Sequence, residues 1–220
     1  NPANNSYLAH VLRYPGGAEV TISRIEYEKR QKADAPHAAL QWVLDIGGQV
    51  RIEGAEKWRS QRDVTDAASA LNPTQIVGID LSGCLLTDEL LAQLVHFENL
   101  QSLDLSNTSL KSLDFLPKLS QLTSLSLRQS QLSSLNTLRH VESLEHLDLS
   151  HSSFDSSIAV TLASLTNLRS LKLVGTRVDR FLLDDLKELK QLTKLDVRQS
   201  KISLEEIKSF FSSHPEISVE

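Results

Sequence analysis

The feature that most constrains the fold is a six-residue pattern, L-x-x-L-x-L, that recurs at nearly constant spacing through the last two thirds of the chain. Its first members lie 24, 22, 22, 24 and 24 residues apart. A half-copy at Ile217 and Val219 follows 22 residues after Leu195 and Val197. Seven copies with so little drift identify an internal repeat. The six full copies begin at Ile76, Leu100, Leu122, Leu144, Leu168 and Leu192.

Each copy predicts one strand followed by a return segment. The L-x-L core alternates apolar and polar residues, which is typical of a half-buried strand. The longer copies leave room for helices: Thr87 opens one, Asp179 caps another, and Ser203 with Glu206 forms a capping box for a third. In a shorter copy, Pro117 stops the return segment early and predicts a turn of 3₁₀ helix.

A strand and a return segment cannot bury their apolar faces alone, so the copies must stack. Stacking predicts an α/β solenoid with a curved parallel sheet on the concave side and helices or 3₁₀ turns on the convex side. The composition agrees: of 39 leucines, four lie in residues 1–70 and 35 in residues 71–220. Identical slots in a repeating core accept the same side chain, so leucine takes the place of aromatics, which make up only 5%.

These copies resemble leucine-rich repeats of 22–24 residues, a family that forms right-handed solenoids. In that family, position 9 of each repeat carries Asn or Cys, which bonds the backbone of neighbouring turns. We expect hydroxyl groups to form similar bonds here over a shorter reach. Cys84 falls at this position and is expected to be structural, because no base or cationic neighbour is evident. Position 9 holds Cys84, Thr108, Ser130, Ser152, Thr176 and Ser200.

The chain before the repeats predicts a cap. Residues 36–46 read as a helix, Gly47 and Gly48 end it, and Val50 and Ile52 alternate with polar residues as a short strand. We expect this helix and strand to be the same unit as a repeat and to cover the first core layer. The two tryptophans of the chain, Trp42 and Trp58, are expected in the core of this cap.

The chain is therefore divided into three parts. Residues 1–34 form an N-terminal extension or linker, with a turn at 14–17 and a strand around Val20 and Ile22. Residues 35–75 form the helix–strand cap, and residues 76–220 form the solenoid.

The cap sequence carries a second resemblance. The run from Ala39 to Val50, together with residues 79–83, resembles the start of bacterial leucine-rich repeat modules, which often follow a membrane anchor or a signalling domain. The same run, with Glu56 and Trp58, is more faintly similar to proteins of the mitochondrial coupling factor B (ATP synthase subunit s) type. Those are small leucine-rich repeat proteins with an assembly or coupling role.

Motifs for chemistry are missing from the sequence. It contains no nucleophile elbow, no phosphate-binding glycine loop, no H-E-x-x-H and no cysteine pair. His146 and His151 flank Asp148, but an exposed histidine pair is favoured over a metal site. We expect no enzyme, no catalytic residue, no metal and no cofactor. The formal net charge of −5 does not favour nucleic acid, and no stretch of about 18 apolar residues predicts membrane insertion.

The family's usual binding face is the concave sheet, whose exposed side chains are expected at positions 3, 5 and 7 of each repeat. None of these positions holds an aromatic residue, so arginine is the remaining hot-spot type. We predict a non-enzymatic protein–protein interaction module with an unidentified protein partner. A structural spacer or assembly factor, the C-terminal module of a larger anchored or signalling protein, is the alternative. The residues predicted to bind the partner are Asp104, Arg128, Asp148, Lys172, Asp196 and Arg198.

The ends of the chain leave the location open. It begins Asn1-Pro2-Ala3 without an initiator Met, so we expect the natural N-terminus to lie upstream. The segment is expected to be soluble and monomeric, and either extracytoplasmic or anchored through a removed N-terminal region. The single cysteine argues against the disulfide-capped repeats of animal extracellular proteins.

Overall fold

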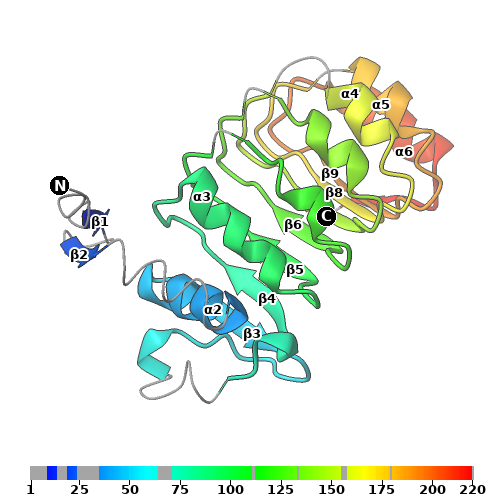
Figure 1. Ribbon diagram of the computed structural model, residues 1–220. Helices are drawn as coiled ribbons and strands as arrows, with labels where there is room; N and C mark the ends of the chain where they lie inside the picture. Colours follow the sequence, from blue (N-terminus) through cyan, green and yellow to red (C-terminus); the bar gives the residue numbers. More distant parts are fainter. Residues whose placement is uncertain are drawn as a thin grey trace.

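The structure is a computed structural model. It describes residues 9–13, 19–23, 35–63, 71–110, 112–132, 134–154, 158–178 and 180–219. In these residues the chain forms one large open sheet with helices along one side of it, and a separate two-stranded sheet near the N-terminus (Figure 1).

The large sheet contains eight strands in the order β10-β9-β8-β7-β6-β5-β4-β3. The seven strands from β4 to β10 run parallel, one for each copy of the repeat. Their order in the sheet is their order in the chain, which confirms the predicted solenoid. The strands are β3 (Gln49–Ile52), β4 (Ile76–Asp80), β5 (Ser102–Asp104), β6 (Ser124–Ser126), β7 (His146–Asp148), β8 (Ser170–Lys172), β9 (Lys194–Asp196) and β10 (Ser218–Val219).

The return segments cover the convex side, and repeat length decides their form. In the described part of the 22-residue copies, the return segments are the 3₁₀ turns η4 (Leu116–Lys118), as Pro117 predicts, and η5 (Asn136–His140). The 24-residue copies carry α-helices: α3 (Asp88–Leu91, continued by the 3₁₀ turn η3, Ala92–His96), α4 (Ile158–Ala163), α5 (Arg180–Leu186) and α6 (Leu204–Ser213). Two further 3₁₀ turns, η1 (Gln61–Asp63) and η2 (Pro73–Gln75), precede β4.

Two of the three predicted helix starts are confirmed. Thr87 is the N-cap of α3, and its Oγ1 accepts from the backbone N–H of Leu90 at 3.4 Å. At α6, the Ser203 Oγ accepts from the Glu206 N–H at 3.3 Å, and the Glu206 Oε2 accepts from the Ser203 N–H at 3.0 Å. This reciprocal pair is the predicted capping box. Asp179 lies outside the described residues.

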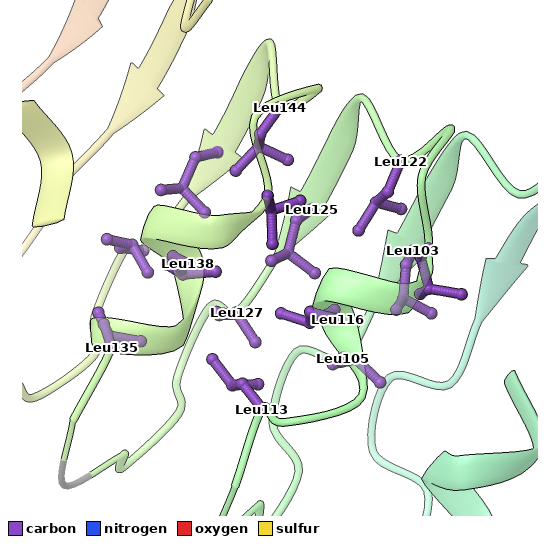
Figure 2. Close-up of a cluster of buried hydrophobic side chains, with 14 of the residues drawn as sticks. Leu103, Leu105, Leu113, Leu116, Leu122, Leu125, Leu127, Leu135, Leu138 and Leu144 are labelled. Carbon is purple, nitrogen blue, oxygen red and sulfur yellow. The ribbon is translucent and has the colours of Figure 1, made fainter. Parts of the chain in front are cut away.

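Leucine fills the space between the sheet and the convex segments. One continuous hydrophobic cluster runs from Ala39 to Ile217, and its strand leucines are almost completely buried. In the middle of the solenoid, each repeat contributes the same set of leucines to its layer (Figure 2). Replacing a fully buried leucine such as Leu125 by alanine typically lowers the free energy of unfolding by about 2–5 kcal/mol, so these leucine layers contribute strongly to the stability of the solenoid.

The segment predicted to be a cap contains the helix α2 (Ala35–Asp45) and β3. Gly47, at φ 88°, ends α2, and the Gly48 N–H donates to the Val43 carbonyl at 2.9 Å. However, β3 pairs antiparallel with β4, so the expectation that it is the same unit as a repeat is wrong. Its alternating residues still place Val50 in the core, opposite Ile79.

The last half-copy pairs in a different register from the predicted one. Val219 lies opposite Leu195, and Ser218 lies opposite Lys194. The spacing is therefore 24 residues, because the ten-residue helix α6 needs the length of a long repeat. A shift by two residues keeps every side chain on the same face of a strand, so alternation alone cannot detect it.

Near the N-terminus, β1 (Ala9–Arg13) and β2 (Glu19–Ser23) pair antiparallel as a small sheet of their own. β2 confirms the strand predicted around Val20 and Ile22. The turn predicted at 14–17 lies outside the described residues.

Candidate functional site

The concave face of the sheet is the face opposite the leucine layers, and its side chains form straight rows. Position 5 of each strand pairs with position 5 of the next strand, from Asp80 to Asp196, and position 3 forms a parallel row from Gly78 to Lys194. Backbone hydrogen bonds continue past the strands: the N–H of position 8 donates to the position-7 carbonyl of the next repeat, as from Gln129 to Ser150 at 2.9 Å. The residues at position 7 therefore form a third row. The repeats thus present three rows in register, at positions 3, 5 and 7, and these rows are polar except at Gly78 and Val174.

The aspartates at position 5 serve their own backbone. In four repeats, the Oδ1 of this aspartate accepts from the N–H of the residue two positions later, at 2.8–3.1 Å, which fixes the end of the strand. Asp104 and Asp148, both predicted to bind a partner, are half-buried in this arrangement. The aspartates concerned are Asp80, Asp104, Asp148 and Asp196.

Asp196 is the most enclosed of these residues, with only 2% of its surface exposed. The Arg198 guanidinium folds over it, with Nε 2.9 Å from Oδ1 and Nη2 2.5 Å from Oδ2. Burial raises the pKa of the Asp196 carboxyl, but hydrogen bonds from the Arg198 side chain and backbone and the charges of Arg198 and Lys172 outweigh it, leaving the pKa lowered. The expectation that all positions of these rows are exposed is therefore wrong at Asp196, and it is also wrong at Ser150 of position 7 and Ser170 of position 3, which are buried.

Arg128 and Lys172 keep their predicted places on the concave face. Arg128 is exposed at position 7 after β6, and Lys172 is half-buried at position 5 of β8, between Asp148 and Asp196. Arg198 is exposed at its side chain, but two of its guanidinium nitrogens bind Asp196. The six predicted residues therefore lie on one face. Asp104, Asp148 and Asp196 hydrogen-bond their own backbone, while the three cations lie at the surface or beside these aspartates.

Position 8 carries a feature that the sequence analysis did not use. All six residues at this position have left-handed backbone, with φ between 55° and 70°, although only Gly83 and Gly175 are glycines. Left-handed backbone costs an ordinary residue about 1–2 kcal/mol. His151 lies over Gly175, where an added Cβ would be only 2.5 Å from its Nδ1. The others are Asn107, Gln129 and Gln199.

Of the hydroxyls at position 9, Ser152 bonds neighbouring turns as expected, but the Ser130 Oγ is buried without a hydrogen-bond partner in the described chain. The Ser152 Oγ accepts from the Ser130 N–H at 3.0 Å and donates to the Leu127 carbonyl of the preceding repeat at 2.7 Å. Thr108 and Thr176 instead donate to carbonyls of their own repeats at 2.6 Å. Cys84 is buried, and burial first and Asp80 second raise its pKa to about 11, which favours a structural thiol over a nucleophile.

The described residues give no sign of a metal centre or a membrane span. No group of three or more His, Cys, Asp or Glu side chains that could hold a metal ion occurs among them. No described helix is both long and apolar enough to cross a membrane.

The structure adds two residues to the concave face that the repeat pattern did not reveal. Arg51 of β3 lies opposite Gly78, the position-3 residue of β4, and the Arg51 guanidinium carbon lies 5.4 Å from the centre of the Trp58 ring. Trp58 is 37% exposed, so its predicted place in the cap core is wrong. Trp42 does pack against the core, as predicted.

A second surface lies on the convex side, between α4 and α5. It is a groove of about 500 Å³ with Phe154, Ile158, Val178 and Phe181 among its lining residues. Phe181 is 62% exposed, and Val160 of α4 is 65% exposed.

Comparisons with known proteins agree with this fold. The model of the Leucine Rich Repeat family matches residues 99–119 and 143–165. The solved structure of internalin C2 from Listeria monocytogenes is similar over 84% of this chain and 81% of its own, with a TM-score of 0.51 and 21% identity. A search of curated proteins finds no significant match.

Two further solved structures are similar at lower scores. A second internalin from Listeria monocytogenes has a TM-score of 0.49 and 15% identity, over 81% of this chain and 53% of its own. A leucine-rich repeat protein from Leptospira interrogans has a TM-score of 0.46 and 19% identity, over 59% of this chain and 39% of its own.

The fold defines a solenoid of stacked strand-and-return units, with a leucine core and a polar concave face. With the matched repeats, this architecture makes the chain a leucine-rich repeat protein. The three relatives described here are bacterial proteins. The fainter similarity to the coupling factor B type finds no counterpart among them and stays a prediction.

Proposed function

We propose that this protein is a non-enzymatic protein–protein interaction module that binds its partner on the concave face. The observation that supports the proposal is the register of the face: mostly polar rows run in line across the six parallel strands β4 to β9, which are held by one leucine core. A rigid face of this kind loses little conformational entropy on binding. Leucine-rich repeat domains in general serve as protein-interaction scaffolds.

The six predicted residues contribute in two ways. Arg128 and Lys172 contact the partner directly, since both lie on the concave face, with Lys172 between the half-buried Asp148 and the buried Asp196. Arg198 contributes through its exposed side chain, which its bonds to Asp196 hold in place. Asp104 and Asp148 offer the carboxylate oxygen that does not accept from their own backbone.

A structural spacer or assembly factor within a larger anchored or signalling protein is the second candidate. The observation that favours it is that the four position-5 aspartates accept hydrogen bonds from the backbone of their own repeats. A spacer needs a rigid solenoid but no concave partner. The two candidates therefore differ in whether the concave face recognises anything.

Charge reversal on the two faces of one repeat separates the candidates. A phage-displayed library of random short peptides is selected on the wild-type chain, and the enriched peptides are tested on Arg128→Glu and Arg139→Glu. Arg139 is the matched control, since it is also exposed but lies on the convex turn η5 of the same repeat.

The interaction module predicts that Arg128→Glu weakens the selected peptides by about tenfold or more while Arg139→Glu leaves them unchanged. Selection of no peptide, or equal behaviour of both variants, would contradict binding on the concave face and favour the spacer.

A further inference from the structure

Three residues at the N-terminal end of the concave face form a cluster that no repeat contains. An antiparallel bridge joins Val50 to Arg59, so Trp58 lies beside Arg51 at the edge of β3. Arg51 in turn lies opposite Gly78 of β4. Since Val50 points into the core, its neighbour Arg51 points to the concave face, together with Trp58.

Gly78 lies beneath this cluster and leaves room for it because it has no side chain. A Cβ at Gly78 would lie 3.0 Å from the Cη2 atom of Trp58 and 3.0 Å from the Arg51 Nε. At the same position the other strands carry Ser102, Ser124, His146, Ser170 and Lys194, each with a side chain. The glycine therefore lets the indole and the guanidinium lie close to the sheet, and packing restricts both side chains before any partner binds.

Arg51 differs from Arg198 in how its charge is used. Arg198 binds the buried Asp196 with two nitrogens. Within the described part of the chain, Arg51 has no ion pair: its Nε is buried without a hydrogen-bond partner, and its guanidinium lies over the face of Trp58. A guanidinium that lies over an aromatic face still offers planar N–H donors at its edge, and these match the geometry of a carboxylate.

We propose that Arg51 and Trp58 form an anchor for a carboxylate-bearing segment of a protein partner. The Arg51 fork binds the carboxylate of a glutamate, an aspartate or a chain terminus, and the exposed part of the Trp58 ring covers the adjoining apolar carbons. Tryptophan and arginine are the residues most enriched at interface hot spots, and here they are prearranged. This inference rests on the proposed function and names the chemistry of the partner at one end of the same face.

The test uses the peptide selection described above, repeated on Arg51→Gln. The anchor predicts that peptides selected on the wild type are enriched in carboxylates and that those selected on Arg51→Gln are not. One enriched peptide is then made with a fluorescent label, along with its Glu→Gln form, and both are titrated against each chain by polarisation.

The expected pattern is a coupling between the two changes. The Glu→Gln peptide should bind the wild type about tenfold more weakly than the parent peptide, but should bind Arg51→Gln as well as the parent does. Trp58→Phe, which keeps an aromatic ring, should lose less than Trp58→Ala. Gln49→Ala is the matched control, because Gln49 lies on the same strand, opposite Asp80, and should not change affinity.

Two results would overturn the anchor. If the peptide substitution weakens binding equally in the wild type and Arg51→Gln, the carboxylate binds elsewhere. If binding depends on Arg128 but not on Arg51 or Trp58, the anchor is wrong while the concave face remains the binding surface. Loss of all selection on the wild type would contradict both the anchor and the proposed function.

Discussion

The two ends of the concave face each hold an arginine, and the protein uses them differently. At the C-terminal end, Arg198 closes over a buried aspartate two residues earlier in its own repeat. At the N-terminal end, Arg51 lies on an antiparallel strand outside the repeats and stacks on Trp58. The comparison shows that Arg198, inside a repeat column, holds a buried carboxylate of its own repeat, while Arg51, outside the columns, has no ion pair in the described part of the chain.

The largest expected effect comes from removing the N-terminal end itself. We propose that residues 35–75 cap the solenoid, because Leu40, Val43, Leu44 and Val50 are buried in the common core. Burial of each such side chain contributes about 1.5–3 kcal/mol, and a domain is stable by only about 5–15 kcal/mol in total. Deletion of residues 1–75 should therefore leave no cooperative unfolding transition in circular dichroism. Deletion of residues 1–34 is the control and should preserve it; a cooperative transition in the longer deletion would contradict the cap.

The two arginines give the next largest effect. Arg198→Gln should destabilise the protein by about 1–3 kcal/mol, because the buried Asp196 carboxylate loses two hydrogen bonds from the guanidinium and its charge, which adds to that of Lys172. Arg51→Gln should change stability by less than about 0.5 kcal/mol, because no buried carboxylate depends on it in the described chain. Urea midpoints at constant slope provide the measurement. Equal midpoints for the two variants would remove the distinction between the two ends.

Acid should weaken the C-terminal end selectively. The lowered pKa of Asp196 means that its carboxylate stabilises the fold above the pKa of the unfolded chain, about 3.9, and loses this contribution as the pH falls through the folded pKa. The stability difference between the wild type and Asp196→Asn should therefore be greatest at neutral pH and shrink below about pH 4. Urea midpoints over a pH series provide the comparison, and a difference independent of pH would contradict the role of Arg198 in holding the charged form.

The smallest effect concerns the left-handed residues at position 8 of the repeats. Gln129 and Gln199 adopt left-handed backbone at φ 57°, where glycine is preferred. Gln129→Gly should raise stability by about 0.5–1 kcal/mol, and Gly175→Ala should lower it, because its Cβ would also meet His151. Thermal unfolding of the two variants provides the measurement. A loss of stability in Gln129→Gly would show that the side chain matters more than the turn.

The sequence was sufficient for the parts of the fold that repeat. The spacing of Leu103, Leu125 and Leu147 predicts the parallel register, and repeat length together with Pro117 predicts where helices give way to 3₁₀ turns. Two details escaped because alternation records only which face a residue occupies. It does not distinguish an antiparallel β3 from a parallel one, nor a two-residue shift at Val219.

The candidate site was only partly predictable for a similar reason. The columns correctly place Arg128 and Lys172 on the concave face, but the burial of Asp196 depends on how Arg198 folds back, which is a tertiary contact. Trp58 lies in a non-repeating segment and reaches the face through one bridge between Val50 and Arg59. Neither contact recurs from repeat to repeat, so neither produces a periodic pattern in the sequence.

One measurement tests most directly whether the non-repeating end of the concave face is where a partner binds. Amide and indole NMR shifts are followed while the carboxylate-bearing peptide selected on the wild type is added to the labelled protein. The largest changes are expected at Arg51, the Trp58 indole, Gly78 and Ser102, with no change at the Trp42 indole. Changes confined to Ile158, Val178 and Phe181, around the convex groove between α4 and α5, would contradict binding on the concave face.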